Sequence, residues 1–550
     1  MKQRQLLIAF GVLLTIAAFC VAGHSQTFPA PDYFQQLFRY PHVPTQLPGP
    51  QSLDEYIVNG KLRLSLQDSI RLMLLNNTDV RLNQAQIDQS GFAVGRAYSP
   101  FDPVFTGSFT PQRSTQPTTS ALQGAQTLSQ LQQQTAFAYN QSFQSGTNFT
   151  VGFNNQRFTT NSSFALFNPS FTSGATFTVG QHLLRGRGYL VNHGPIMIAQ
   201  RNLKQSRANF EAQLNDSILT VISQYWSLVQ AEKNLAVVED SLHLAEESYK
   251  HDKRALELGA LSPLDIYRSE ATVAQRRLQV IQAEYAVKPL EDQFRRTIGA
   301  DLDSRAGALD LDLTETAEVS GTPASGDIPT ALEMAMSKRP ELEVARQQLA
   351  NDDTNVYIAN NNLQPDVSLS GIYTSNGIGG NVIDASNGSP VIVSHGGLLD
   401  ALDQVGGFGF PTYSVGLTLS LPIKNHRAEA DLGSALVSKR TDLYQLRSRQ
   451  QAITLEVRNA VHQLEVSKLS LAASSDALNL AKKSLAADQR KYDLGAETIF
   501  FVLDSQNTVQ QSEQSYVQAQ IGYQLALAGL DHATGELLEH NRVLISDAIH

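Results

Sequence analysis

A segment in the first half of the chain carries apolar residues at the spacing of a very long helix. From about Asn202 to Leu258, apolar positions alternate by four and three residues, which is typical of a coiled-coil seam. At 1.5 Å per residue this helix would be about 85 Å long. A glycine break follows, so we expect a partner helix from about Pro263 to Ile298 to run back beside it. The seam positions are Leu214, Ile218, Val221, Tyr225, Leu228, Leu235, Leu242, Tyr249 and Leu256.

Elsewhere the apolar period changes from 3.6 to 2. Phe105 and Phe109 alternate with hydroxyl residues, and Val367, Leu369 and Tyr373 do the same in the second half of the chain. One apolar face and one hydroxyl-rich face are the pattern of a strand that separates lipid from water. We expect further strands at about 135–144, 147–155, 172–181 and 412–421.

Two polar stretches interrupt these strands. They are the glutamine-rich run Gln123–Gln134 and the glycine-rich run Gly377–Gly407. Because such segments bury little apolar surface, we expect both to be mobile loops. The first half has more strand signal than the second, and the sequence leaves open whether its extra hairpin joins the same sheet or projects from it.

The chain is a tandem duplication. Without a gap, Gln67–Pro103 aligns with Pro329–Pro365, and Val221–Gly299 aligns with Val457–Gly535. Each copy reads helix, strands, long helix, glycine break, helix. The opening helix of the first copy has Ser65 as its N-cap and is expected to continue until the prolines at its end. Internal repetition on this scale favours one two-repeat body over several unrelated domains.

These patterns predict an α+β membrane protein with a duplicated helix–strand–long helical hairpin repeat. The first repeat covers 62–300, with strands at about 104–181 and a helical hairpin at about 195–299. The second covers 327–538, with strands at about 366–421 and a hairpin at about 430–535. The other segments are a signal peptide (1–25), an extended proline-rich arm (26–61), a linker (301–326) and a C-terminal tail (539–550).

The first residues have the form of a secretory signal. Lys2 and Arg4 precede an apolar run from Leu6 to Ala22, and small residues follow it. After this segment no uncharged apolar run of eighteen residues occurs, so any crossing of a membrane would use β-strands. Cys20, the only cysteine, lies inside the signal, and Phe19 before it favours ordinary cleavage, with lipidation as the alternative.

Composition and motifs exclude several classes of protein. The formal net charge is −10 without a basic stripe, so nucleic acid is not an expected partner. There is no phosphate loop, zinc signature or nucleophile elbow, so we expect neither an enzyme nor a cofactor. We interpret the histidines as surface or interface residues and expect no metal site: His182, His193, His243 and His251.

About four strands per chain are too few to close a barrel. Open sheet edges are not tolerated in lipid, so several chains must share one barrel. Three copies would give about twelve strands around a water-filled lumen. The helical arms would continue this wall, and a tube of that kind is a conduit.

The chain resembles the TolC-like outer-membrane efflux proteins over roughly residues 62–538. The resemblance rests on the opening helix Leu64–Pro103, the segment Gln181–Gly188 and, above all, Lys491–Gln506 on the duplicated frame. It implies a homotrimer in which a 12-stranded outer-membrane β-barrel is continued by a periplasmic α-helical coiled-coil barrel.

The function implied by the resemblance is that of an exit duct of a tripartite efflux pump. Such a duct conducts substrates passively, docks a periplasmic adaptor and is driven by an inner-membrane pump. A type I protein-secretion duct stays open as an alternative. From another class, a periplasmic adaptor or a structural coiled-coil protein stays open as well.

The resemblance also implies a functional site at the ends of the helical hairpins. Two turns match the adaptor-docking turns of the family, although each glycine could equally serve only as a helix cap. The first turn is Leu258, Gly259, Ala260, Leu261 and Ser262, and the second is Leu494, Gly495, Ala496, Glu497 and Thr498.

Three further residues match or face the family's periplasmic gate. Tyr492 matches a gate tyrosine, and Asp504 matches a carboxylate that threefold symmetry gathers into a ring at the closed entrance. The alternative for Asp504 is an acid on a solvated helix face. The chain departs from the family at Phe501, where a second aspartate is expected, and at Glu497, where an arginine is expected. Asp265 lies opposite Phe501 in the duplication and could supply the missing acid.

Overall fold

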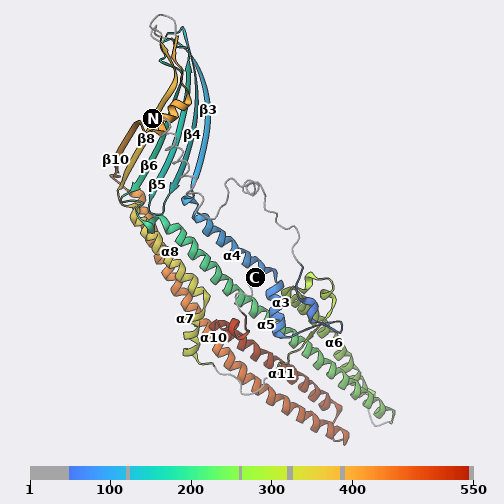
Figure 1. Ribbon diagram of the computed structural model, residues 1–550. Helices are drawn as coiled ribbons and strands as arrows, with labels where there is room; N and C mark the ends of the chain where they lie inside the picture. Colours follow the sequence, from blue (N-terminus) through green and yellow to red (C-terminus); the bar gives the residue numbers. More distant parts are fainter. Residues whose placement is uncertain (1–48, 119–123, 259–262, 319–325, 385–390, 544–550) are drawn as a thin grey trace. The chain divides into compact units, whose positions relative to one another are not determined.

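The computed structural model describes residues 49–118, 124–258, 263–318, 326–384 and 391–543 (Figure 1). The predicted signal peptide with Cys20, and most of the proline-rich arm, lie outside these ranges. The chain divides into two compact units. The first contains Gly95–Ile196 and Thr354–Ala435, and the second contains Pro48–Val94, Met197–Asp353 and Leu436–His550.

The first unit is built around one antiparallel sheet, whose strands follow one another in the order β10-β8-β6-β5-β4-β3 (Figure 1). The short strand β9 pairs with β8 beside this path. All six predicted strands are confirmed, and the extra hairpin, β4 with β5, belongs to the same sheet. The bounds are β3 Val104–Pro117, β4 Thr127–Ser142, β5 Thr147–Thr160, β6 Phe167–His182, β8 Asp366–Asp384, β9 Val391–Ser394 and β10 Phe410–Ser420.

The register divides the sheet into an apolar face and a polar face. Side chains of directly paired residues share a face, because the side-chain period of a strand is 2. One row across all six strands is apolar and largely aromatic: Tyr413, Tyr373, Phe177, Val151, Tyr139 and Phe105. The neighbouring row on the other face is small, with hydroxyl groups on four of the six strands: Thr412, Thr374, Thr176, Gly152, Ala138 and Thr106.

Two expectations about loops are wrong for the described residues. Most of the glutamine-rich run is strand, because β4 begins at Thr127 and is paired on both sides, by β3 and β5. The glycine-rich run contains the outer part of β8, then β9 and the helix α9 (Leu398–Gly406). Gly377 is required there, since a Cβ at this position would collide with the carbonyl of Ala401 in α9. Backbone pairing with neighbours outweighs the weak strand preference of glutamine and glycine.

The expected count of about four strands per chain is also wrong. Six strands of at least 11 residues form the sheet in the described part of the chain. The twelve-strand total for three copies was obtained from the lower count and therefore loses its basis.

The second unit is mainly helical. Its helices include the first helices of both repeats and nearly all of both long hairpins, which are labelled in Figure 1. A small sheet, β1 (Ile57–Val58), β2 (Lys61–Leu64) and β7 (Asp310–Leu313), lies beside them. The helices are α3 Leu66–Asn76, α4 Thr78–Ala97, α5 Tyr189–Glu257, α6 Pro263–Ile298, α7 Ile328–Lys338, α8 Pro340–Asn362, α10 His426–Asp493, α11 Ile499–Thr534 and α12 Leu537–His540. Within the described ranges, none of the helices has a segment both long and apolar enough to span a membrane.

The helices confirm the duplication. The long helices α5 and α10 have 69 and 68 residues, and their partners α6 and α11 have 36 each. Ser65 caps α3 in a capping box, as predicted. The opening helix is not continuous, however, because Asn77 interrupts it between α3 and α4. Arg339 interrupts the second copy at the equivalent position, so the break belongs to the repeat.

The core of this unit lies around the first half of α5. Five predicted seam residues of that helix are at most 1% exposed: Leu214, Ile218, Val221, Tyr225 and Leu228. The hydroxyl group of Tyr225 accepts a hydrogen bond from the amide of Glu315 at 3.1 Å, next to β7. The seam therefore packs on the small sheet and on α3 and α6, and the hairpins extend from this anchored region.

Candidate functional site: the ends of the helical hairpins

The turn between α10 and α11 is fixed by its backbone. Gly495 has a φ of 72°, and its amide donates to the carbonyl of Tyr492 at 2.9 Å. The amide of Ala496 donates to the carbonyl of Lys491, also at 2.9 Å. A Cβ at Gly495 would meet nothing within 4 Å, so the left-handed backbone, not crowding, requires glycine.

Both hairpin ends present an exposed leucine. In the second hairpin, Leu494 is 84% exposed. In the first hairpin, Leu258 is 85% exposed and is the last described residue before the turn. Gly259, Ala260, Leu261 and Ser262 lie outside the described residues. Large apolar side chains that stand in solvent at the end of a polar helical hairpin are typical of a contact surface.

Glu497, which replaces the expected arginine, forms an ion pair within its own turn. Its Oε1 is 3.0 Å from Nζ of Lys491, and the same Nζ is 3.2 Å from Asp488. The second oxygen of Glu497 is buried without a hydrogen-bond partner. Thr498 stands at the N-cap of α11, but its side chain makes no capping hydrogen bond. The charges of this turn therefore reinforce α10 and the turn itself.

A polar cluster near the hairpin ends connects α5, α6 and α10. The hydroxyl of Tyr492 donates to Oδ1 of Asp252 at 2.7 Å, and the hydroxyl of Ser269 donates to the other oxygen. The Asp252 side chain is fully buried. His251 covers the cluster, with its ring centroid 5.9 Å from that of Tyr492. Burial, and then the charge and hydrogen bond of Asp252, raise the pKa of Tyr492, so its phenol keeps the proton that it donates.

The structure changes the assignment of the gate residues. Tyr492 takes part in a contact between hairpins, but its partner Asp252 is a residue that the sequence did not single out. Asp265 is half-buried on α6 and acts on Tyr492 through its charge. Asp504 is exposed on α11, and its backbone carbonyl accepts a hydrogen bond from the hydroxyl of Thr508. The heptad pattern placed Asp252 beside the seam, and nothing in the sequence indicated its burial.

Comparison with known proteins agrees with this arrangement. The family described as "Outer membrane efflux protein" matches residues 331–536. The chain is 23% identical to the outer membrane protein TolC of Vibrio cholerae over 349 residues, which are 62% of this chain and 73% of that protein. It is 24% identical to the pyoverdine export outer membrane protein OpmQ of Pseudomonas aeruginosa, over 61% of this chain and 65% of that protein. This chain is similar to the TolC-like outer-membrane efflux proteins.

The agreement in fold covers a larger part of the chain. The crystal structure of VceC from Vibrio cholerae superposes with a TM-score of 0.59 at 14% identity, covering 86% of this chain and 96% of VceC. OprN superposes with a TM-score of 0.60, also at 14% identity, over 86% of this chain and 90% of OprN. The chain therefore shares the fold of these outer-membrane proteins over most of its length.

Arg276 is a second link between the two helical hairpins. It lies on α6, is only 5% exposed, and donates to the side-chain carbonyl oxygens of Gln510 and Asn507 on α11. Its Nη1 also donates to Gln279 at 2.9 Å. Burial lowers the pKa of Arg276, because the guanidinium is surrounded by amides and not by a carboxylate. Gln506 and Ser248 extend the same polar seam from α11 to α5, at 3.1 Å.

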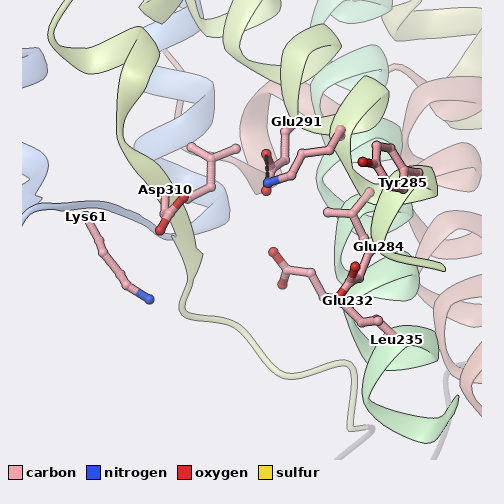
Figure 2. A pocket seen from close by; sticks show the side chains of 10 residues that line it. Lys61, Glu232, Leu235, Glu284, Tyr285, Glu291 and Asp310 are labelled. Atoms are coloured by element: carbon pink, nitrogen blue, oxygen red, sulfur yellow. Dashed lines mark ion pairs between the residues drawn. The ribbon is translucent and has the colours of Figure 1, made fainter. Parts of the chain in front are cut away.

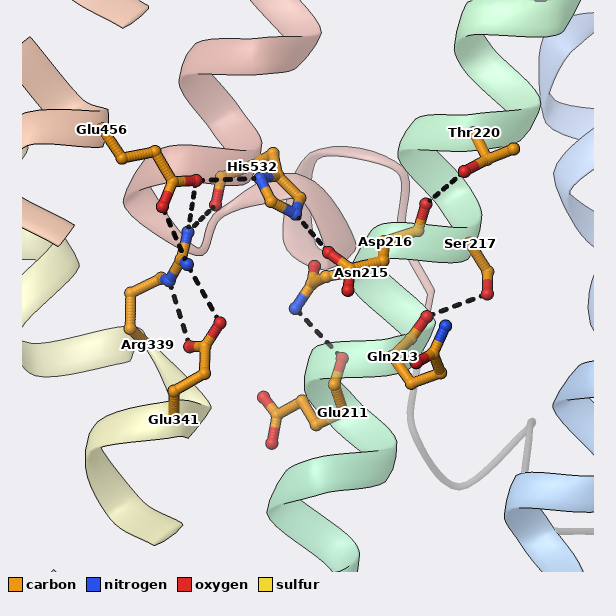
Figure 3. A network of polar contacts seen from close by, with 10 residues as sticks. All are labelled: Glu211, Gln213, Asn215, Asp216, Ser217, Thr220, Arg339, Glu341, Glu456 and His532. Atoms are coloured by element: carbon orange, nitrogen blue, oxygen red, sulfur yellow. Dashed lines mark hydrogen bonds and ion pairs between the residues drawn. The ribbon is translucent and has the colours of Figure 1, made fainter. Parts of the chain in front are cut away.

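A further network holds the second repeat together, as Figure 3 shows. Arg339, at the break between α7 and α8, binds both oxygens of Glu456 at 3.0 and 3.1 Å and both oxygens of Glu341 at 2.9 and 3.1 Å. His532 lies 2.8 Å from Asp216 and 3.4 Å from Glu456. Burial opposes protonation of His532, but the hydrogen bonds to Glu456 and Asp216 outweigh it and raise its pKa. This network joins α5, α8, α10 and α11.

The first repeat has a pocket of about 540 Å³ between α5, α6, β2 and β7, whose lining Figure 2 shows. Its walls carry more carboxylates than amines, and Glu291 is paired with Lys288 at 3.5 Å. Burial, and then the charges of Glu291 and Asp312, raise the pKa of Glu232 to about 7. The lining residues are Lys61, Glu232, Leu235, Glu284, Tyr285, Val287, Lys288, Glu291, Asp310 and Leu311. The pocket belongs to the anchored region of the helices, so it is not part of the hairpin ends.

Proposed function

We propose that three copies of this chain form the outer-membrane exit duct of a tripartite efflux pump. One observation carries the proposal: the antiparallel sheet has exposed apolar rows on one face, a largely polar opposite face, and two long edge strands without a partner among the described residues. A sheet of this kind is stable in a membrane only when further copies pair with both edges.

In this proposal the helical hairpins of the three copies surround a periplasmic tunnel. The predicted boundaries of the two repeats, 62–300 and 327–538, are part of the proposal. TolC and OpmQ, to which the chain is similar, are named as an outer membrane protein and a pyoverdine export protein. The duct performs no chemistry, so a periplasmic adaptor and an inner-membrane pump supply its substrate and the energy.

The duct function is tested by fractionation, conductance and complementation. We expect a trimer in the outer-membrane fraction, ion conductance after reconstitution in planar bilayers, and restored dye efflux in a strain that lacks its own duct but has the matching pump and adaptor. A monomer in the soluble fraction, or a trimer that never conducts, would refute the proposal.

The hairpin ends are the proposed docking site for the adaptor. The exposed Leu494 and Leu258 support this role, since each stands near the end of its hairpin. The turn that follows Leu494 is held by backbone hydrogen bonds. Gly495→Val should abolish efflux while leaving trimers in the membrane, because the turn requires a positive φ. The matched control is Gly522→Val on α11, where a Cβ would also meet nothing within 4 Å. Normal efflux by Gly495→Val would refute docking at this turn.

The contact between Tyr492 and Asp252 is the proposed closure of the periplasmic end. It supports closure because a buried carboxylate on α5 holds a tyrosine on α10, so the ends of the two hairpins cannot separate without breaking it. Asp504 and Asp265 are proposed to face the entrance as charged residues.

A further inference from the structure

We infer that the membrane-spanning wall of the duct is an 18-stranded barrel, with six strands from each of three chains and a wide uncharged lumen. The inference rests on the proposed trimeric duct. Its basis is the hairpin β4–β5, which the sequence alone could not assign to the wall.

The hairpin is an integral part of the sheet. Pairing between β3 and β4 runs from Val104 with Asn140 to Pro117 with Thr127. The other side of the hairpin, β5, pairs with β6 from Thr147 with Gln181 to Phe158 with Ser170. The hairpin therefore separates β3 from β6 along their length, and it cannot project from the sheet without breaking both ladders.

The hairpin also has the side-chain pattern of a membrane wall. Tyr139 of β4 and Val151 of β5 lie on the apolar face of the sheet, in the same row as Phe105 and Phe177. Phe137 and Phe153 pair with each other in the next row of that face. Phe137 is 43% exposed, although it lies in the middle of a strand paired on both sides. A hairpin that projected into water would have no use for these exposed aromatic rows, whereas lipid requires an apolar surface.

Each of the six strands is long enough to cross a membrane. A tilted transmembrane strand needs about 9–11 residues. The shortest of the six, β10, has 11 residues, and β4 and β5 have 16 and 14. The hairpin therefore spans the same thickness as its neighbours and is not a partial rim.

The even number of strands allows closure. In an antiparallel sheet of six strands, the edge strands β3 and β10 run in opposite directions, so β10 of one copy can pair antiparallel with β3 of the next. Three copies then give an all-antiparallel ring of 18 strands, and bacterial outer-membrane barrels have even strand numbers. At a strand spacing of about 4.8 Å and a tilt of about 40°, the backbone radius is about 18 Å, compared with about 12 Å for twelve strands.

The lumen of this barrel would be wide and uncharged. Among the described strands, the polar face carries mainly hydroxyl, amide and glycine residues, with a few apolar ones such as Phe158, Ile372 and Ile378. Its ionisable side chains lie at the strand ends: His182, Asp366 and Asp384. A lumen with about twice the cross-section of a twelve-stranded barrel, and without a ring of charge, fits bulky hydrophilic solutes of either sign. Selection of substrates then falls to the helical hairpin ends.

A matched pair of substitutions tests whether the hairpin is part of the wall. Tyr139→Asp places a charge on the apolar face, and its neighbour Asn140→Asp places the same charge on the polar face. We expect Tyr139→Asp to reduce the heat-modifiable trimer in the outer membrane at least tenfold, because lipid rejects a charge, and Asn140→Asp to leave it unchanged. Equal amounts of trimer for both variants would overturn the inference.

The strand number is tested directly by imaging the purified duct. Electron cryo-microscopy of the wild-type protein should resolve 18 strands around the threefold axis. A variant lacking residues 119–160 keeps residues 161–166 as the connection from β3 to β6, and it should show 12. A wild-type ring of twelve strands, whether from three chains with the hairpin outside it or from two complete chains, would overturn the inference. A wild-type ring of 18 strands that does not conduct would instead count against the proposed function.

Disulfide crosslinking provides a test that does not depend on the deletion variant. In a Cys20→Ser background, Thr412→Cys on β10 is combined in turn with Thr106→Cys, Ser108→Cys and Thr110→Cys on β3, all on the polar face. Within one chain β3 and β10 are five strand spacings apart, about 24 Å, so a disulfide between them must join two copies. We expect one register to yield covalent trimers. The inference fails if no pair crosslinks.

Discussion

The contact between Tyr492 and Asp252 gives the sharpest test of how the hairpin ends stay closed. Tyr492→Phe keeps the ring and its packing against His251 but removes the hydroxyl that donates to Asp252. Asp252 then keeps Ser269 as its donor and loses one hydrogen bond in a fully buried position. A hydrogen bond to a charged group contributes about 1.5–3 kcal/mol.

This magnitude predicts a large change in the closed population. At about 1.4 kcal/mol per factor of ten, the ratio of closed to open hairpin ends should fall about 10- to 150-fold in each chain. In planar bilayers, Tyr492→Phe should raise the mean conductance and lengthen the open periods. Cells that express it should also become more sensitive to a large antibiotic that the outer membrane normally excludes.

The control is Tyr267→Phe, which removes a hydroxyl from an exposed tyrosine on α6. It should conduct as the wild type does. Asp252→Asn keeps an acceptor for Tyr492 without the charge and should give an intermediate conductance. If Tyr492→Phe and Tyr267→Phe give the same conductance and the same antibiotic sensitivity, the contact does not hold the ends closed and the reasoning is refuted.

Three further predictions concern stability. Glu232 has a raised pKa of about 7 in the folded protein, so the folded state loses stability as pH rises through this value. Glu232→Gln should therefore stabilise the trimer at pH 8 by about 1 kcal/mol, after allowance for solvent screening. This gain is measured as a shift of the thermal midpoint that vanishes at pH 5, and the control Glu284→Gln should give no such shift. Arg339→Lys loses the bidentate contacts and should cost about 2 kcal/mol in urea unfolding; a cost below about 0.5 kcal/mol would contradict this role. Gly299→Ala should cost more than about 1 kcal/mol, because φ is 75° and the added Cβ would lie 2.6 Å from Cβ of Asn76; unchanged stability would contradict it.

The helical part of the fold could be predicted because its signals are local and repeated. A seam that runs from Leu214 to Leu256 defines a helix by itself, and Gly495 marks the turn because few other residues adopt its backbone conformation. The break at Asn77 escaped notice because asparagine is tolerated within helices. Its equivalence to Arg339 in the second repeat is the signal that could have revealed it.

The site could be predicted only in part, because burial depends on contacts between distant segments. The sequence indicated Tyr492, but its partner Asp252 lies 240 residues away on α5 and belongs to the other repeat. The buried Arg276 escaped for the same reason, since its partners Gln510 and Asn507 come from the other repeat. Similarly, Thr127–Gln134 is strand because β3 and β5 pair with it on both sides, and no local preference records this.

The two repeats have kept their helices equal while their sheets have diverged. The long helices differ by a single residue, and their partner helices have equal length, whereas the first repeat contributes four long strands and the second contributes two. Helical hairpins that must end at a common level cannot gain a turn in one repeat alone, because each turn adds about 5.4 Å. A sheet that closes through its edges accepts any inserted hairpin, because two added strands preserve the antiparallel order at both edges. Variation in the width of such ducts is therefore expected in the sheet, and the docking end is expected to stay constant.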